Sequence, residues 1–470
     1  MIKGVIRIVS STILCAVCLC TTAQTLVTYS PPREVIYSMH NDDYTVRVRK
    51  PGGDWQDLYE YNVKIDSDKP QDASMVYFDF SGQVEVCVRK NNGMTQDVRI
   101  RPASAGIHCR RQGNLVYFTL ARPANLSIEY NSDKLHNLHL FANPLETNKP
   151  LPTDTGVVYF GPGLHMPDST GEYHISSGKT VYIAGGAVVK GKLVCDRVSN
   201  IHIRGRGMLY QAGEGIQITY SNNITIDDIM VVNPAHYSVF GGQSDHIVIR
   251  NLKSFSARGW GDGIDMMCCS DVAIDRVFMR NSDDCIAIYG HRWKYYGNCR
   301  NYVVTNSTLW ADIAHPINIG THGDTGAAAD TLENIRFKNI DILEHDEDDP
   351  EYEGCMAISD GDNNLVRNIH FEDIRVADFE EGKLLNLRVI FNKKYNTAPG
   401  RGIQDIYFKN ISYNGANLSP SVIGGYDGQR RVKNITFENL RVNGALITNA
   451  PSGNIRVGPF AQSILFKSSK

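Results

Sequence analysis

A short apolar pattern returns along most of the chain. Each copy begins with Asn, Asp or His, which is followed by an apolar residue, any residue and a second apolar residue. Nine copies start at Asn200, Asn223, His246, Asp271, Asn301, Asn334, Asn368, Asp405 and Asn434. Successive starts lie 23 to 37 residues apart. Self-similarity at this period predicts a solenoid, in which each unit buries its apolar side chains against its neighbours.

The repeats predict an all-β fold. Their strands are short and rich in β-branched residues, and almost no helical periodicity lies between them. A parallel β-helix fits this pattern better than a leucine-rich or helical repeat. The longer intervals after Gly290 indicate loops on one face of the solenoid, where binding clefts are commonly built.

The segment before the repeats has a different pattern. From residue 24 to about 145, alternating apolar and polar residues occur in short runs such as Tyr44–Arg49 and Leu115–Leu120, which Gly, Pro, Asn and Asp separate. Such runs predict the antiparallel strands of a small β-sandwich. Pro150 and Pro152 mark the junction. We therefore predict a signal peptide in residues 1–23, a sandwich domain in 24–150 and a β-helix domain in 151–470.

The first residues resemble a secretory leader. Lys3 and Arg7 precede an apolar run that ends at Cys20, and small residues follow up to Ala23. The run is short for a transmembrane helix, and no later segment is apolar enough to span a membrane. We expect a secreted or periplasmic protein without a membrane span after cleavage, with a retained N-terminal anchor as the alternative.

Composition excludes some functions. The net charge is −3 and 21% of residues are charged, so no broad face is available to neutralise phosphates and we expect no nucleic-acid partner. Eight of the 11 cysteines follow the leader, and the segment that holds both Cys87 and Cys109 suggests a disulfide between them. No Cys/His spacing indicates a metal, and no organic cofactor is implied.

Polar residues recur at one place in the solenoid. When the second strand of successive coils is aligned by its apolar pattern, His236, Asp262, Asp284 and His315 fall in one column, with Asp283 beside it. Neighbouring strands lie about 4.8 Å apart, so these side chains should stand together. Stacked carboxylates repel unless a proton, a cation or a water lies between them.

This column suits an inverting glycosidase. Asp262 and Asp284 would hold a water and Asp283 would donate a proton, with the acid and base groups roughly 6.5–9.5 Å apart. The alternative is that these aspartates only bond to their own turns, as Asp and Asn often do in such folds. That alternative fits Asp271 and Asp275 best.

Three motifs carry a family resemblance. Gly261–Asp265, Asn281–Ile288 and Ala314–Gly320 resemble the polygalacturonases of glycoside hydrolase family 28 and their clan relatives, the dextranases and isopullulanases. The likeness covers about residues 157–470. It implies a right-handed parallel β-helix that hydrolyses α-glycosidic bonds of a polysaccharide with inversion. The sandwich before the β-helix resembles the dextranase and isopullulanase layout.

The resemblance also assigns roles. It makes Asp283 the general acid, Asp262 and Asp284 the base pair, and His315 the residue that orients the acid. For substrate binding we expect His236, Asp265, Trp260, Tyr289, Trp293 and His322. The rings of this region, including Tyr295, Tyr296 and Trp310, either stack on sugars or pack loops onto the solenoid.

One part of the polygalacturonase pattern is missing. The coil after His315 should carry an Arg-Ile-Lys motif for a substrate carboxylate, but Met356 and Ile358 stand where the two bases are expected. The acidic run Asp346–Asp349 just before it would repel a polyuronate, or it is a solvated loop or a calcium site. We therefore expect a neutral glycan substrate, with pectin as the alternative.

Two other functions stay open. A calcium-dependent β-helix lyase would use the aspartates as metal ligands and Arg292 or Lys294 as the base. A non-catalytic carbohydrate-binding solenoid would bind glycans without turnover. The sequence gives no indication of the oligomeric state.

Overall fold

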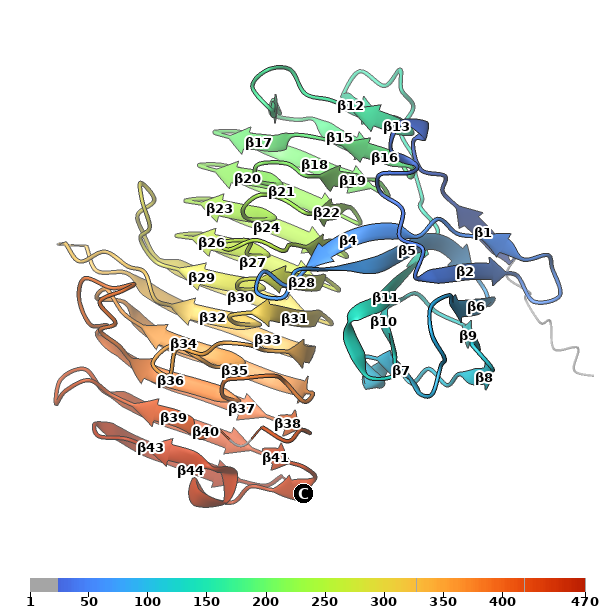
Figure 1. The fold of residues 1–470 in the computed structure, drawn as a ribbon. Coiled ribbons are helices and arrows are strands. Elements are labelled where there is room, and N and C mark those ends of the chain that lie inside the picture. The colour runs from blue at the N-terminus through green and yellow to red at the C-terminus, as the bar shows by residue number, and fades with distance from the viewer. Residues whose placement is uncertain (1–23, 327, 418, 470) are drawn as a thin grey trace, which may run out of the picture.

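The computed structural model describes residues 24–326, 328–417 and 419–469, so the predicted leader lies outside the described residues. These residues fold almost wholly into β-strands, which form a small two-sheet unit beside a long stack of coils (Figure 1). Three short 3-10 helices lie among them: η1 (Arg33–Val35), η2 (Ala103–Ala105) and η3 (Pro451–Gly453). No helix in the described part of the chain has the length and apolar character to cross a membrane.

The N-terminal strands form two sheets. The six-stranded sheet has the order β1-β5-β11-β10-β7, and a sixth strand, β4, pairs with β5. Its strands are β1 (Thr25–Thr28), β4 (Tyr61–Ile65), β5 (Gln71–Ser81), β7 (Val98–Arg101), β10 (Ala124–Tyr130) and β11 (Asp133–Pro144). The five-stranded sheet, in order, has β3 (Gln56–Asp57), β2 (Tyr44–Arg49), β6 (Val84–Lys90), β9 (Leu115–Leu120) and β8 (Arg110–Gln112). Alternate residues of both sheets form one buried apolar cluster between them.

The remaining strands wind into a right-handed parallel β-helix. An 11-stranded parallel sheet runs along one face. Its strands are β14 (Glu172–His174), β17 (Lys192–Asp196), β20 (Ile216–Thr219), β23 (Val239–Gly242), β26 (Ile264–Met267), β29 (Ile286–Tyr289), β32 (Ile317–Gly320), β34 (Met356–Asp360), β36 (Leu385–Val389), β39 (Ser421–Gly424) and β43 (Ile455–Val457).

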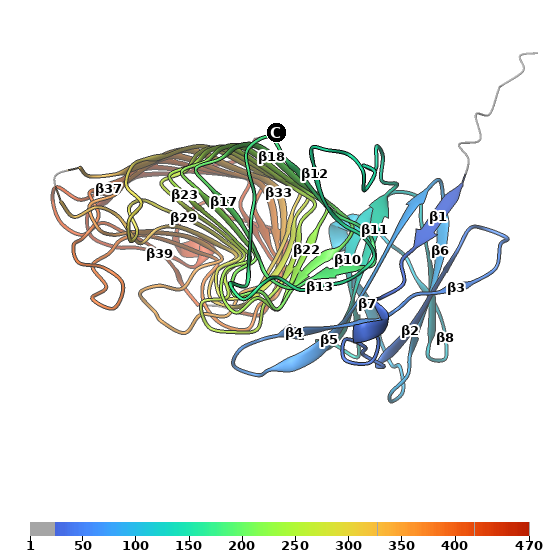
Figure 2. The same cartoon turned by 90° about the horizontal axis from the view of Figure 1, so that it is seen from above.

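The other faces of the β-helix belong to one 22-stranded sheet. Its strands are β12 (Val157–Phe160), β13 (Gly163–His165), β15 (Thr180–Ile183), β16 (Ala187–Val189), β18 (Ser199–Gly205), β19 (Met208–Tyr210), β21 (Asn222–Asp227), β22 (Met230–Val232), β24 (Asp245–Arg250), β25 (Lys253–Phe255), β27 (Ser270–Asp275), β28 (Phe278–Ser282), β30 (Cys299–Thr305), β31 (Thr308–Ile313), β33 (Thr331–Glu344), β35 (Leu365–Val376), β37 (Gly402–Lys409), β38 (Ser412–Tyr413), β40 (Val432–Glu438), β41 (Arg441–Val442), β42 (Ala445–Leu446) and β44 (Ala461–Lys467). Figure 2 looks along this stack.

The first residue of the repeat has a structural reason. At all nine starts its φ lies between 54° and 61°, in the left-handed region that Asn, Asp and His tolerate better than other residues with a Cβ. The side chains also bond from coil to coil. Asn368 donates to Asn334 (2.7 Å), Asn334 to Asn301 (3.2 Å) and Asn301 to Asp271 (2.8 Å). The repeat therefore marks one bend of each coil.

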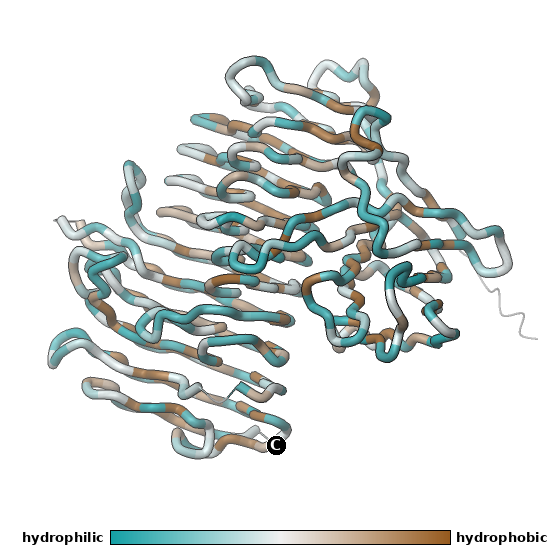
Figure 3. The backbone as a smooth tube through the Cα atoms, viewed as in Figure 1, coloured by the Kyte–Doolittle hydropathy of each residue, from teal (hydrophilic) through white to brown (hydrophobic). Residues whose placement is uncertain are grey.

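The residues after each bend fill the core. Their isoleucines, valines and phenylalanines stack in register from coil to coil and are almost fully buried. Phe371, Phe408 and Phe437 stack with neighbouring ring centroids 4.9 Å apart. Apolar residues accordingly recur along every coil in Figure 3. This continuous core is the main source of stability for a solenoid.

Buried arginines join the sandwich to the β-helix. Arg206 binds Asp79 on β5 at 2.9 Å, and Arg280 on β28 binds Asp312 at 2.9 Å and Asn137 on β11 at 2.8 Å. Both guanidinium groups are almost completely buried. Loss of one partner of a buried pair commonly costs about 3–5 kcal/mol, so the Arg206–Asp79 pair, together with the Arg280–Asn137 bond, fixes the relative position of the two parts.

The structure bears on two predictions for the N-terminal part of the chain, the disulfide and the domain limits. All eight cysteines of the described residues are free thiols, so the predicted disulfide between Cys87 and Cys109 is wrong. Cys87 lies buried on β6, whereas Cys109 is exposed just before β8, and β9 runs between these two strands. The domain limits at residues 24–150 and 151–470 stay predictions, although the last strand of the two sheets ends at Pro144 and the first strand of the β-helix begins at Val157.

Candidate active site

The proposed catalytic residues come from neighbouring strands of the 11-stranded sheet. Asp262, Asp284 and His315 each stand two residues before β26, β29 and β32 respectively. Ile264, Ile286 and the equivalent residue of β32 pair in register. Asp262, Asp284 and His315 therefore share one height on successive coils, as the sequence predicted.

The fourth member of the column is different. Val239 of β23 pairs with Ile264, and the backbone N of Ser238 donates to the Asp262 carbonyl at 2.9 Å. Tyr237, not His236, is therefore level with Asp262. The predicted place of His236 is wrong by one residue, and its ring packs edge-on against that of Tyr237, with the ring centroids 4.0 Å apart. His236 lies half-buried beside Glu214 and Lys192.

Asp284 is the best-partnered carboxylate of the site. His315 donates to its Oδ1 twice, through Nδ1 at 2.6 Å and through the backbone N at 3.1 Å. Asn318 Nδ2 and Tyr289 Oη donate to Oδ2 at 2.7 Å and 3.0 Å. Four donors occupy the roughly four acceptor positions that an ionised carboxylate offers, so Asp284 is held as an anion.

His315 is held as a cation. Its Nε2 donates to the Tyr352 carbonyl at 2.6 Å, so both ring nitrogens act as donors, which requires the protonated ring. Burial opposes this charge, but the Asp284 carboxylate outweighs burial and raises the pKa of His315 to about 9. Burial alone would raise the pKa of Asp284, yet the His315 charge and the hydrogen bonds hold it below its usual range.

Asp262 and Asp265 have the opposite environment. Asp265 is fully buried below the cleft, and its carboxyl group lies against that of Asp262, so the two can bond only through a shared proton. Oδ1 of Asp262 is buried, and no N–H group of a described residue donates to it. Burial, followed by the charge of the other carboxyl groups, raises the pKa of both well above the usual range. Since Asp265 does not reach the surface, the predicted contact of Asp265 with the substrate is wrong. Asp265 lies behind Asp262 instead.

Asp283 is the more accessible carboxyl. The backbone N atoms of Trp260 and Asp284 donate to it at 3.0 Å each. Burial and the Asp284 charge nevertheless raise its pKa to about 7. One carboxyl group is therefore available as an acid at neutral pH, next to a second that stays ionised, which is a common arrangement for general acid catalysis.

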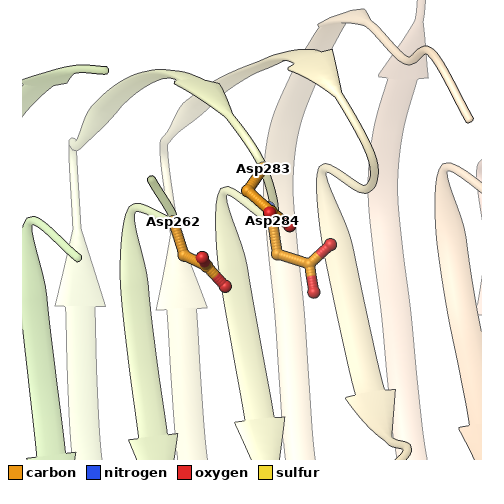
Figure 4. A group of neighbouring side chains, drawn as sticks. All are labelled: Asp262, Asp283 and Asp284. Atoms are coloured by element: carbon orange, nitrogen blue, oxygen red, sulfur yellow. The ribbon is translucent and has the colours of Figure 1, made fainter. Parts of the chain in front are cut away.

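The three carboxyl groups lie next to one another (Figure 4). One oxygen each of Asp262, Asp283 and Asp284 lies within 4.8 Å of the other two, and no second group of His, Cys, Asp and Glu in residues 24–469 outside the gaps has such a geometry. This spacing is shorter than the roughly 6.5–9.5 Å expected between the carboxyl groups of an inverting glycosidase. It would also suit a divalent cation.

The predicted aromatic residues divide into two groups. Trp260 and Trp293 are 58% and 55% exposed beside the carboxylates, so both are open to a ligand. Tyr289 is buried and donates to Asp284, while His322 packs edge-on against its ring at 5.0 Å. Trp310 is wholly buried below the Arg280 guanidinium at 4.1 Å, so it belongs to the junction with the sandwich.

Arg292 is a cation of the cleft. Its guanidinium lies over the rings of Tyr289 (5.3 Å) and Trp293 (5.0 Å), and its charge acts on Asp262 and Asp265. Its side chain forms no ion pair or hydrogen bond at contact distance with any described residue, although Asp262 and Asp265 act on it electrostatically. A partly buried guanidinium with no bonded counter-ion is a natural partner for an anionic ligand.

The predicted register of the coil after His315 is wrong. Met356 and Ile358 point into the core and are fully buried, so they do not occupy the positions of the missing bases. The outward positions of β34 are Ala357 and Ser359, which still supply neither charge. The acidic run Asp346–Asp349 leads to Tyr352, which contacts His315. This run therefore lies beside the column.

Sequence reasoning missed three residues of the site. Predicting Tyr237 would have required the exact pairing register of β23, and a short apolar pattern does not give the register to a single residue. Asn318 stands on the same face as Asp265 and lies three residues after His315, so strand alternation could have identified it. Tyr352 comes from a loop, for which the sequence carries no periodic signal.

The family model of the glycosyl hydrolases family 28 matches residues 163–457, which include the whole column. The chain belongs to this family. Similar relatives are a putative galacturan 1,4-alpha-galacturonidase A of Aspergillus niger and a probable endo-xylogalacturonan hydrolase A of Neosartorya fischeri, each 23% identical. The matches cover 47% and 53% of this chain, and only 53% and 59% of those relatives.

A solved structure shares the fold over nearly the full length. Dex49A from Penicillium minioluteum superposes with a TM-score of 0.51 and covers 91% of this chain and 94% of its own. The sequence identity is 14%, so the similarity concerns the fold alone. The family 28 match and this neighbour together establish the β-helix architecture that the repeats predicted.

The His315 ion pair makes stability depend on pH. A pKa raised from the ordinary 6.5 to about 9 stabilises the fold fully below pH 6.5, and this contribution is lost as the pH rises through about 9. We expect His315→Gln to lose on the order of 3 kcal/mol more at pH 6 than at pH 9.5. Urea unfolding of both proteins at the two pH values measures this difference. An equal loss at both values would contradict a charged His315.

Proposed function

We propose that this family 28 protein is an exported hydrolase that cleaves α-glycosidic bonds of a polysaccharide with inversion. The observation that carries the proposal is the contrast between Asp283, whose pKa is raised to about 7, and Asp284, which the His315 cation holds ionised. Export is supported by the leader-like residues 1–23.

The proposed reaction uses the residues as follows. Asp283 gives its proton to the glycosidic oxygen as the bond from that oxygen to the anomeric carbon breaks. A water bound at the Asp262 carboxylate, beside the other two carboxyl groups, attacks the anomeric carbon and gives its proton to Asp262. Asp284 has no free acceptor position, so it acts as a fixed negative charge. This division of labour differs from an equal base pair of Asp262 and Asp284.

Asp265 would keep Asp262 ready for this step. Burial raises the pKa of Asp262 and of Asp265, and the two carboxyl groups are hydrogen-bonded, so the pair would share one proton, which Asp265 holds while Asp262 acts as the base. A neutral carboxyl group behind Asp262 adds no second negative charge. The proposed working state therefore has Asp283 and Asp265 protonated, and Asp262 and Asp284 ionised.

The configuration of the product depends on which group attacks the anomeric carbon. Spacing alone would favour retention, because one oxygen each of Asp262, Asp283 and Asp284 lies within 4.8 Å of the other two. Inversion is supported by membership of family 28. A retaining enzyme would instead use a carboxylate as the nucleophile.

For the substrate we propose a uronate-containing glycan. Arg292 supports this choice, because it offers a cation with no bonded counter-ion within the cleft. The neutral glycan expected from the sequence stays a second candidate, since Ala357 and Ser359 replace the missing bases and an acidic run lies beside His315. Burying an unpaired substrate carboxylate would cost several kcal/mol, so the charge at Arg292 supports the uronate.

The rival functions are less well supported. A lyase would place Ca²⁺ among the three carboxylates, but Asp284 already accepts four hydrogen bonds and its charge is balanced by His315. A non-catalytic solenoid would not account for a carboxyl of raised pKa beside an ionised one. Both rivals make different predictions for turnover.

We expect Asp283→Asn to lower kcat by about a thousandfold without loss of folding, since a positioned acid contributes roughly 10²–10⁴. Wild-type kcat should fall as the pH rises above about 7, because Asp283 then loses the proton that it donates. Initial rates from pH 4 to pH 9 measure both effects, and circular dichroism checks the fold. A folded variant with near-normal turnover would disprove the acid role.

We expect hydrolysis to survive a chelator. The products should carry the anomer opposite to the cleaved bond and should show no unsaturated-uronate absorbance. Proton NMR of fresh product and ultraviolet spectra, with and without EDTA, test these points. Retention would show that the short spacing governs the chemistry, and absorbance that depends on Ca²⁺ would support a lyase.

We expect polygalacturonate to be cleaved faster than dextran, pullulan or a neutral galactan. Arg292→Gln should raise KM for polygalacturonate at least about tenfold, the equivalent of 1.4 kcal/mol. Lys294→Gln is the matched control, because Lys294 is an exposed cation of the same loop that lies over Tyr295. Preference for a neutral glycan, or equal effects of the two variants, would overturn the proposed substrate.

A further inference from the structure

The outer face of the five-stranded sheet carries an aromatic and basic cleft far from the carboxylates. In both cartoon views this sheet lies on the side of the sandwich that faces away from the β-helix (Figures 1 and 2). The cleft has a volume of about 630 Å³, within the roughly 300–1,000 Å³ of small-ligand pockets. The mechanism proposed above uses none of its residues.

Strand register places the cleft residues side by side. Arg47, Cys87, Tyr117 and Arg110 form one row across β2, β6, β9 and β8. Arg49, Glu85 and Thr119 form the next outward row. The two rows alternate with buried valines and phenylalanines of the sandwich core, so their side chains lie on the outer face of the sheet, where that of Cys87 is covered by its neighbours.

Two rings form the centre of the cleft. Trp55 and Tyr117 are partly exposed, with centroids 6.4 Å apart. The Arg49 guanidinium lies 4.3 Å from the Trp55 ring and binds Glu85 at 2.6 Å, which holds the indole in place. Fixed rings with hydrogen-bonding groups at their edges suit a sugar, which presents C–H groups on one face and hydroxyl groups around its rim.

The charge of the cleft favours an acidic ligand. Arg49 is neutralised by Glu85, but Arg110 makes no ion pair with any residue of the described segments. Its guanidinium lies 5.0 Å from the Tyr117 ring, where a carboxylate on a stacked sugar would meet it. Arg89 on the same face also lacks an ion pair in the described chain.

We propose that this face is a second glycan-binding site, which holds an acidic polysaccharide chain outside the catalytic cleft. The choice of polygalacturonate as its ligand rests on the proposed function, whereas the existence of the site does not. Such a site would raise the local concentration of the polymer at the cleft without changing the chemical step.

The test measures binding apart from turnover. In full-length Asp283→Asn protein, Trp55→Ala, Tyr117→Ala and Arg110→Gln should each weaken polygalacturonate binding about tenfold in calorimetry and in affinity gels. Tyr37→Ala is the matched control, because Tyr37 is a 93% exposed ring in the same N-terminal part of the chain. Melting temperatures verify that each variant is folded.

The outcomes separate the two proposals. Unchanged binding by the folded variants, or equal binding of dextran through Trp55, would overturn the acidic glycan site. In catalytically active protein, Trp55→Ala should slow cleavage of dilute polymer but leave the rate on a galacturonate trimer unchanged. If wild-type protein hydrolyses no glycan while binding still depends on Trp55 and Arg110, the hydrolase proposal fails and the binding site stands.

Discussion

The register of the stacked strands is the constraint on which the rest of the structure depends. Each coil repeats the last at the spacing of a β-sheet, so a residue's position within its coil determines which residues it meets on the coils above and below. Asp262, Asp284 and His315 become neighbours through backbone pairing of β26, β29 and β32, although the chain between them is long. The buried apolar columns hold that pairing in place.

The stacking of the coils also determines the protonation states of the carboxyl groups in the site. Carboxyl groups brought this close in a buried position cannot all be ionised, so each one takes the state that its own donors allow. Asp284 has four donors and is bonded to the His315 cation, whereas Asp265 is bonded to no cation and lies against another carboxyl group. The difference arises from the residues at neighbouring strand positions rather than from any special backbone geometry. A single fold feature thus produces both an acid and an anion.

Periodic features are what the sequence can predict. The repeat marks the coils, and the motifs around Asp262, Asp283 and His315 are enough to locate the column of carboxylates. Contacts that depend on loops or on one residue of register are beyond such patterns. The expected position of His236 is off by one residue, Met356 and Ile358 lie on the opposite face of β34 from the one expected, and the burial of Trp310 depends on a sandwich whose docking no local pattern reveals.

The buried arginines have an evolutionary consequence. Arg280 stands three residues before Asp283, and Asp312, its partner, stands three residues before His315. The sandwich therefore contacts the same two coils that carry the acid Asp283 and the neighbouring cation His315. A domain attached in this way is not an exchangeable module, since its loss would remove the bonds of Arg280 to Asn137 and to the Lys134 carbonyl and would uncover the Arg280–Asp312 pair behind the active site. The two parts are expected to be inherited together, and to diverge together in families that share this architecture.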